Sequence, residues 1–222
     1  MRLYVIRHGE TSWNVARRLQ GHAGADLNEN GVRLAEVTAR AMKDIPFDLC
    51  FTSPLTRAAH TARIILAGRN VPVIEEPRIM EISFGEWEGL CCASGRSEIP
   101  GTNFLETFHK TPFDYVPAPG GESIADVCAR TADFYQELSG NPEYQDKTIL
   151  ISTHGCASRA FLRNVYEDKE DYWHGGVPMN CAVSIVDVKD GKAVLLESDK
   201  IYYDASDCVD YYAAKEEKNE DK

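Results

Sequence analysis

The amino-acid sequence predicts an α/β protein with a three-layer αβα architecture, in which a mainly parallel central sheet is flanked by helices. Short apolar runs alternate with longer segments of helical periodicity, which is the pattern of β-α-β units. The runs are continuously apolar, as strands are when helices cover both faces of a sheet. The length of 222 residues suits one α/β unit, and we expect a single domain over 1–214 with a small cap insertion near 90–121.

The first half of the chain contains three expected strands and two expected helices. They are a strand at 3–6, a helix from about 29 to 43, a strand at 47–52, a helix from 53 to about 67 and a strand at 71–74. Asn28 is expected to cap the first helix, whose apolar face is predicted to contain Leu34, Thr38, Ala41 and Ile45. Ser53 and Pro54 suit the capping and first positions of the second helix. Pro72 removes a backbone donor and therefore predicts an edge strand.

The second half begins with a stretch that has no regular pattern. Residues 90–121 are too long for an ordinary connection, so we expect a partly helical lid or cap there. The elements expected next are a helix at about 122–138, a strand at 148–153, a helix at about 156–166, and strands at 181–188 and 193–198 that are joined by a turn at 190–191. The polar segment 215–222 is expected to be a disordered tail.

Composition and charge exclude several classes of protein. The net charge of −11 argues against a general nucleic-acid binder, which needs a basic face. No apolar run approaches the roughly 18 residues of a membrane span, and the chain starts without a signal-peptide pattern, so we expect no membrane association and a cytoplasmic location. Seven cysteines without a C-x-x-C pair, including the adjacent Cys91 and Cys92, indicate reduced thiols rather than disulfides or zinc ligands.

Polar residues follow each of the first four expected strands. They are Arg7 and His8 after the first, Arg57 after the second, Glu81 shortly after the third, and His154 after the fourth. In a parallel sheet the segments that follow the strands meet at the carboxyl edge, where ligands bind. We therefore expect two arginines, two histidines and one carboxylate to lie close together.

This set of side chains suits phosphoryl transfer. Guanidinium groups grip phosphate oxygens, and a neutral imidazole is a competent nucleophile toward phosphorus. A second, protonated imidazole can stabilise charge on the transferring group, and a carboxylic acid can protonate the leaving oxygen. Because arginine and histidine supply the positive charge, the sequence predicts a site that needs neither a metal nor another cofactor.

Five motifs occur in a characteristic order over roughly residues 1–190. They are R-H-G-E-T at 7–11, S-P-L-x-R-A-x-x-T-A at 53–62, E-x-x-F-G-x-W-E-G at 81–89, P-G-G-E-S at 119–123 and H-G at 154–155. This pattern resembles the histidine phosphatase superfamily, the phosphoglycerate mutase-like clan with two histidines. The resemblance implies a metal-independent phosphatase whose nucleophile, phosphorylated during the reaction, is His8. It also implies a phosphate pocket of Arg7, Arg57 and His154, a further donor in Asn14, a proton donor in Glu81 and a turn near the substrate at Gln20 and Gly21.

Some assignments remain open at this level. Glu75, Glu76, Glu86 and Glu88 are alternative acids to Glu81. Aromatic residues such as Phe84 and Trp173 are expected in the core or the cap rather than against substrate. Thr11 and Ser123 are expected to support a loop or a helix start.

The sequence favours a hydrolase over a mutase. The resemblance implies that a mutase carries an arginine pair just before the P-G-G-E-S segment, where this chain has none, and an asparagine after the H-G pair, where it has Cys156. We therefore expect a phosphomonoester hydrolase that acts on a small phosphorylated substrate. The alternatives are a phosphoglycerate-type mutase and a catalytically silent phosphate-binding protein. The sequence predicts neither the identity of the substrate nor the oligomeric state.

Overall fold

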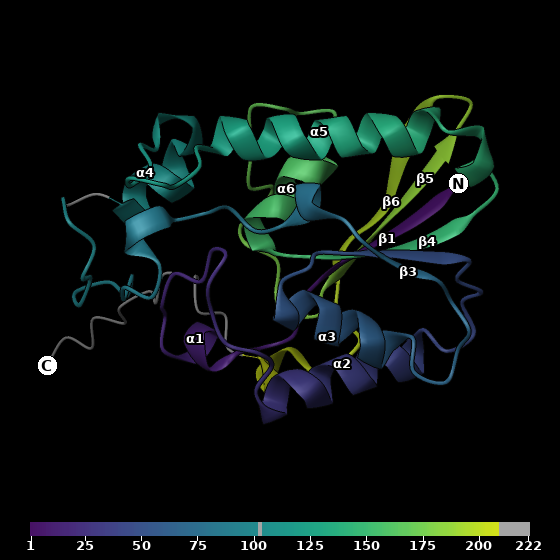
Figure 1. Ribbon diagram of the computed structural model, residues 1–222, viewed down its shortest axis with the longest axis horizontal. Helices are drawn as coiled ribbons and strands as arrows, with labels where there is room; N and C mark the ends of the chain where they lie inside the picture. The colour runs from purple at the N-terminus through teal and green to yellow at the C-terminus, as the bar shows by residue number, and fades with distance from the viewer. Residues whose placement is uncertain (102–103, 209–222) are drawn as a thin grey trace, which may run out of the picture.

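Six strands form one mixed sheet in the computed structural model, which describes residues 1–101 and 104–208 (Figure 1). The order across the sheet is β3-β2-β4-β1-β5-β6. The strands are β1 (Arg2–Arg7), β2 (Leu49–Thr52), β3 (Val73–Glu75), β4 (Thr148–Thr153), β5 (Val183–Lys189) and β6 (Lys192–Lys200). The first four run parallel to one another, β5 runs antiparallel to β1, and β6 antiparallel to β5. The expected mainly parallel sheet is confirmed, and β3 lies at its edge as predicted.

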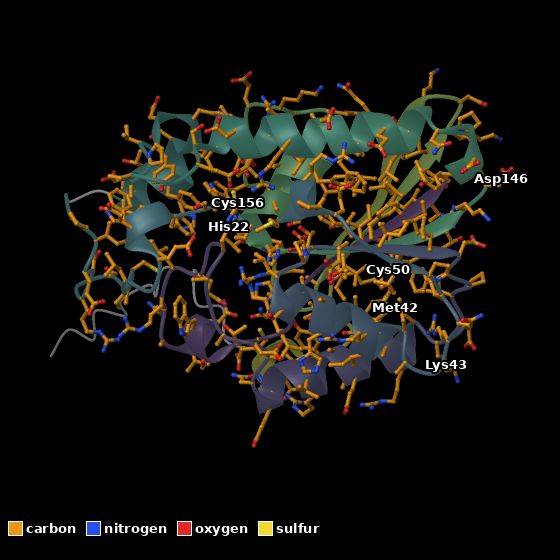
Figure 2. The ribbon with its side chains drawn as sticks, in the orientation of Figure 1. His22, Met42, Lys43, Cys50, Asp146 and Cys156 are labelled. Carbon is orange, nitrogen blue, oxygen red and sulfur yellow. The ribbon has the colours of Figure 1, made fainter. Side chains whose placement is uncertain are left out.

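The register of the central strands aligns their carboxyl ends. Arg7 of β1 lies opposite Thr153 of β4, and Thr52 of β2 lies opposite Ser152. The residues that follow these strands therefore emerge side by side at one edge. In Figure 2, His22 and Cys156 lie toward this end of the molecule and Asp146 lies toward the other.

Helices cover both faces of the sheet. α2 (Glu29–Ala41) and α3 (Thr56–Ile65) pack on one face, and α5 (Ile124–Gly140) and α6 (Gly155–Leu162) pack on the other (Figure 1). β1 serves both cores because successive side chains of a strand point to opposite faces. Tyr4 and Ile6 enter one apolar cluster, and Leu3 and Val5 enter the other. This two-sided burial explains why the strand is continuously apolar.

Helix caps were predicted with mixed success. Asn28 caps α2 as expected, and its side chain accepts a hydrogen bond from the Gly31 N–H at 2.7 Å. Ser123 likewise caps α5, in a capping box with Asp126, so that helix begins after Glu122. The prediction that Ser53 caps α3 is wrong, because the helix begins at Thr56 and the Ser53 hydroxyl lies 2.8 Å from His154 Nε2.

Three further helical details differ from expectation. The buried face of α2 continues from Leu34 and Thr38 to Met42, whereas Ala41 is exposed and Ile45 lies beyond the end of the helix. α6 ends at Leu162, short of the expected Tyr166. The sequence reading omitted α1 (Ser12–Val15), a single turn that is closed by a capping box between Thr11 and Asn14.

The cap over the carboxyl edge is partly helical, as predicted. It contains α4 (Phe104–Lys110) and a 3₁₀ turn at Pro112–Asp114, and it lies at the end of the molecule near α1 (Figure 1). All seven cysteines are free thiols. Within the described ranges, no helix has the length and apolar character needed to cross a bilayer. The expected tail at 215–222 lies outside the described residues.

Candidate active site

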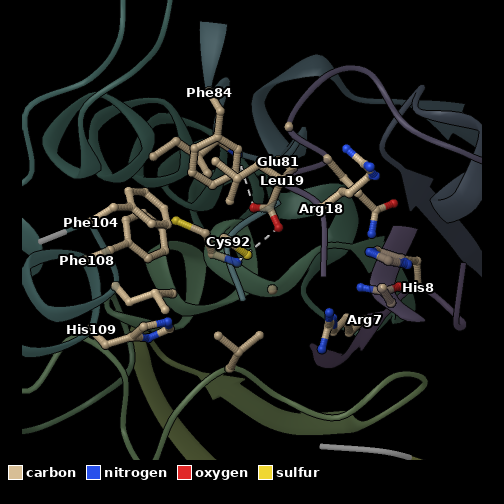
Figure 3. A pocket seen from close by; sticks show the side chains of 18 of the residues that line it. Arg7, His8, Arg18, Leu19, Glu81, Phe84, Cys92, Phe104, Phe108 and His109 are labelled. Carbon is tan, nitrogen blue, oxygen red and sulfur yellow. Dashed lines mark hydrogen bonds between the residues drawn. The ribbon is translucent and has the colours of Figure 1, made fainter. Parts of the chain in front are cut away.

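A cavity of about 560 Å³, including its open mouth, lies between the strand ends and the cap. Its polar half consists of Arg7, His8, Asn14, Gln20, Gly21, Arg57 and Glu81. Its aromatic half consists of Leu105 and the rings of Phe84, Phe104, Phe108, His109 and Trp173, and Arg18 lines the cavity as well. Figure 3 shows Phe104, Phe108 and His109 across the cavity from Arg7 and His8. The sequence thus brings its predicted residues to one place, although His154 is not among the described residues that line the cavity surface.

His8 is held as a neutral imidazole with its Nε2 unprotonated. It directly follows β1 and is only 2% exposed. Its Nδ1 lies 2.7 Å from the Gly9 carbonyl oxygen, which can only accept, so Nδ1 carries the proton and Nε2 carries the lone pair. Burial, followed by the charges of Arg57 and Arg7, holds the pKa of His8 well below its usual value. These are the properties of a nucleophile.

The loop that carries His8 is fixed by its backbone. Asn180, a buried residue that the sequence reading did not identify, donates to the His8 carbonyl at 3.0 Å. The Gly9 N–H donates to Thr61 Oγ1 at 3.0 Å. A side chain at Gly9 would bring its Cβ within 2.7 Å of the Gly31 carbonyl oxygen, so glycine is required for this close packing.

The two arginines are buried, and backbone carbonyl oxygens hold their guanidinium groups in place. Arg57 donates to the carbonyl oxygens of Gly21 at 2.7 Å and Ala23 at 3.1 Å. Arg7 donates to the carbonyl oxygen of Pro178. Gly21 has a φ of +47°, and a Cβ there would meet a carboxylate oxygen of Glu88 at 2.1 Å. Gly21 therefore shapes the turn that orients Arg57.

His154 caps α6 through its backbone position and lies next to His8, with the two ring centroids 5.2 Å apart. Its Nε2 is bonded to Ser53 Oγ, and its buried Nδ1 has no hydrogen-bond partner within the described residues. Burial, then the charges of Arg57 and His8, keep the pKa of His154 well below its usual value. The imidazole is therefore neutral in the ligand-free protein, whereas the expected protonated imidazole refers to the site with a phosphoryl group in transfer.

Asn14 has the geometry of a hydrogen-bond donor. It is buried at the edge of the cavity, and its Oδ1 accepts from the Thr11 N–H at 3.1 Å. This bond orients the amide, and Nδ2 is left without a protein partner in the described part of the chain. Gln20 also lines the cavity, and its Oε1 accepts from Thr11 Oγ1 at 3.0 Å.

Glu81 is the only carboxylate among the described residues that line the cavity (Figure 3). Its oxygens accept hydrogen bonds from the backbone N–H groups of Ala157 at 3.0 Å and Cys156 at 3.3 Å, at the start of α6. Glu88 instead anchors a loop through the N–H groups of His22 and Ala23 at 2.8 and 2.6 Å.

The other alternative acids, Glu75, Glu76 and Glu86, are likewise not among the described residues that line the cavity. Glu76 forms an ion pair with Arg78 at 2.7 Å. The geometry therefore favours Glu81 as the acid.

Arg130 fixes the backbone of Glu81 and was not identified from the sequence. Its guanidinium donates to the carbonyl oxygens of Met80 at 2.7 Å and Glu81 at 3.0 Å, and it pairs with Glu122 at 2.8 Å. His22 Nε2 lies 3.0 Å from the same Glu81 carbonyl oxygen. This network holds the acid in place from behind.

Phe84 and Trp173 belong to a buried apolar cluster, as expected, with only 6% and 5% of their surface exposed. Both line the cavity, together with Phe104 and Phe108 of α4. Trp173 comes from the segment after α6, and its indole N–H donates to the Phe108 carbonyl at 2.8 Å. Residues 1–101 and 104–208 contain no group of three or more His, Cys, Asp or Glu arranged to hold a metal ion.

Comparisons with known proteins agree with this geometry. A sequence model described as histidine phosphatase superfamily (branch 1) matches residues 3–200. Phosphoserine phosphatase 1 of Hydrogenobacter thermophilus is 30% identical over 89% of this chain and 91% of its own length. A 2,3-bisphosphoglycerate-dependent phosphoglycerate mutase of Cytophaga hutchinsonii is 34% identical over 78% of this chain and 81% of its own. The solved structure of Bacillus stearothermophilus YhfR aligns with a TM-score of 0.80 at 28% identity, covering 90% of this chain and 97% of that one.

Proposed function

This chain belongs to the histidine phosphatase superfamily, branch 1, and on that premise we propose that it hydrolyses small phosphomonoesters through a phosphohistidine on His8. The observation that carries the proposal is the state of His8. Its Nδ1 proton is committed to the Gly9 carbonyl, so a lone pair on Nε2 is available beside two buried arginines. A neutral nucleophile next to permanent cations suits attack on a phosphate dianion.

In the first step His8 displaces the alcohol from phosphorus. The Nε2 lone pair forms the N–P bond while the P–O bond to the alcohol breaks, and its electron pair stays on the leaving oxygen. Glu81, entering as the carboxylic acid, gives that oxygen a proton. The products are phosphohistidine, the free alcohol and the Glu81 carboxylate, which accepts the N–H groups at the start of α6.

Four donors stabilise the transferring phosphoryl group in this proposal. Arg7 and Arg57 supply charge, and Asn14 Nδ2 supplies a neutral N–H from a buried, oriented amide. His154 contributes without being protonated, because a hydrogen bond donated by Ser53 to its Nε2 leaves a proton on Nδ1. Donors that are fixed before the reaction stabilise the developing charge without reorganisation, which replaces the role that metal ions have in many phosphoryl-transfer enzymes.

The second step returns the enzyme to its starting state. A water oxygen forms the new P–O bond, the N–P bond breaks, and its electron pair returns to His8 Nε2. The Glu81 carboxylate takes a proton from that water and becomes the acid for the next cycle. Phosphate leaves, and no net proton or electron is gained by the protein.

Rapid quenching tests the covalent intermediate. Wild-type enzyme mixed with ³²P-labelled substrate should give an acid-labile, base-stable phosphoprotein, and His8→Ala should lose both the label and turnover. His60 on α3 is not among the described residues of the cavity, so His60→Ala is the matched control and should label normally. Rates should be the same with and without EDTA. Full turnover in His8→Ala would overturn the mechanism.

A mutase is the second candidate because several of the relatives are phosphoglycerate mutases. A mutase must hold a second anionic group on the intermediate. Beyond Arg7 and Arg57, the described cavity residues include one further arginine or lysine, Arg18, which is paired with Glu98, and this favours hydrolysis. Incubation with 3-phosphoglycerate and a trace of 2,3-bisphosphoglycerate should release inorganic phosphate or leave the substrate unchanged, whereas formation of 2-phosphoglycerate would establish the mutase.

A further inference from the structure

We propose that the natural substrate carries a single phosphate on an uncharged alcohol with an aromatic or similarly bulky apolar part, which occupies the aromatic half of the cavity. The proposal rests on the phosphatase function above and specifies its substrate class. It also separates this chain from enzymes whose leaving group carries a carboxylate or a second phosphate.

The wall opposite the nucleophile is made of rings. Phe104 and Phe108 are stacked with centroids 5.1 Å apart, and Phe84 lies 5.7 Å from Phe108. Trp173 lies 5.3 Å from Phe108. Figure 3 shows that two of these rings, Phe104 and Phe108, lie across the cavity from His8, on the side that a leaving group would occupy. Phe104 is partly exposed, whereas Phe84, Phe108 and Trp173 are buried behind it, so an apolar group placed against Phe104 removes its ring surface from water.

The aromatic half offers little to a second anion. Burial lowers the pKa of His109, so its imidazole is neutral at physiological pH, and its ring packs 5.3 Å from that of Trp173. Arg18 is the one additional arginine or lysine among the described cavity residues, and its Nη1 donates to the Gly89 carbonyl and lies 3.4 Å from a Glu98 oxygen. A carboxylate or phosphate beside Arg18 would meet the negative charge of Glu98 and give up its own hydration.

The ring wall is also formed before substrate arrives. The Trp173 N–H is satisfied by the Phe108 carbonyl, and Phe108 packs edge-on against Tyr115 at 5.2 Å. Four neighbouring ring contacts fix these side chains in one arrangement, so binding an apolar group costs little ordering of the protein.

Four alkyl phosphates test the proposal because their leaving groups are all primary alcohols. They are 2-phenylethyl phosphate, ethyl phosphate, phosphoserine and 3-phosphoglycerate. We expect kcat/KM for 2-phenylethyl phosphate to exceed each of the other three by roughly tenfold or more, the scale of one buried apolar group. A higher value for phosphoserine or 3-phosphoglycerate would overturn the proposal.

A pair of variants separates the ring wall from general effects on the cap. In Phe104→Ala the ratio of kcat/KM for 2-phenylethyl over ethyl phosphate should fall roughly tenfold. Phe113 belongs to the same cap but is exposed and not among the described cavity residues, so Phe113→Ala should keep the wild-type ratio. A wild-type ratio in a folded Phe104→Ala would overturn the inference. Failure of the phosphatase function itself is recognised separately, because no ester would be hydrolysed and no phosphohistidine would form.

Discussion

The polar and aromatic halves of the cavity are built by different means. The polar half comes from the end of β1 and from the loops and first helical turns that follow β1, β2 and β3, and backbone groups hold it, as the Gly9 carbonyl holds His8. The aromatic half comes from α4 and from loops before and after it, and contacts between rings hold it. Backbone hydrogen bonds fix the positions of single atoms, whereas packed rings fix the size and shape of the space between them. The first arrangement suits the chemical step and the second suits the choice of substrate.

The difference can be tested most strongly at Arg57. Arg57→Ala removes a cation beside His8 and the two hydrogen bonds to the 21–23 turn. We expect kcat/KM to fall roughly 10²–10³-fold, the scale of losing one preorganised donor. The loss should be equal for ethyl and 2-phenylethyl phosphate, measured by phosphate release, because Arg57 acts on the phosphoryl group that both esters share. A loss confined to one ester would contradict the division into two halves.

Glu81 links the two halves, because it must meet the leaving oxygen. Glu81→Gln should slow hydrolysis of alkyl phosphates by ~10²-fold, the usual contribution of a general acid. Aryl phosphates need less protonation, so the mutant should show a pre-steady-state burst of phenol release and no burst with an alkyl ester. Wild-type behaviour on both would mean that Glu81 is not the acid.

The pH profile measures the electrostatics of the polar half. Burial, Arg57 and Arg7 lower the pKa of His8, so the neutral nucleophile persists well below pH 6.5 and the acid limb of kcat/KM should lie there. Arg57→Gln removes one of these charges, which raises the pKa of His8 and moves the limb to higher pH. Arg57→Lys keeps the charge, so its acid limb of kcat/KM should lie at the same pH as that of the wild type. Ionisation of the substrate is common to all three proteins, so an unmoved limb in Arg57→Gln would refute the assignment.

The smallest expected effect is on stability. Folding lowers the pKa values of His8 and His154. Below about pH 6.5 these two histidines therefore bind protons in the unfolded chain but not in the folded chain. The free energy of unfolding should therefore fall between pH 6.5 and 5.5, by about 1 kcal/mol for each histidine. His8→Asn and His154→Asn should each reduce this fall in urea titrations without phosphate, and the double variant should reduce it further. If the free energy of unfolding of the double variant fell as much as that of the wild type, these histidines would not be the source of the pH dependence.

Sequence patterns predicted the polar half better than the aromatic half for a physical reason. A buried strand has a local signature, and the expected strand at 148–153 matches the bounds of β4 (Thr148–Thr153). The pairing of Ser53 with His154 and the bond from Trp173 to Phe108 join residues far apart in the chain, and no local pattern encodes them. The same limit explains the misplaced α3 cap, since the Ser53 hydroxyl is engaged by a distant partner.

The electrostatic state of the site also lay beyond sequence reasoning. The chemistry alone suggested a protonated His154 during phosphoryl transfer, and it said nothing about the state of His154 in the ligand-free protein. Its neutrality comes first from complete burial and then from the charge of Arg57, and both depend on the finished fold. Arg130, which supports Glu81 from α5, has no local sequence signature either.

The position of β4 has a consequence for how the protein folds. β4 inserts between β1 and β2, and most of the chain separates it in sequence from β1. Until it is in place, both neighbouring strands have an open edge, and His8 and His154 have not met. Closing so long a loop is slow compared with forming helices. On dilution from denaturant, helical circular dichroism should therefore return before phosphatase activity, and the intermediate with open strand edges is the species most exposed to aggregation.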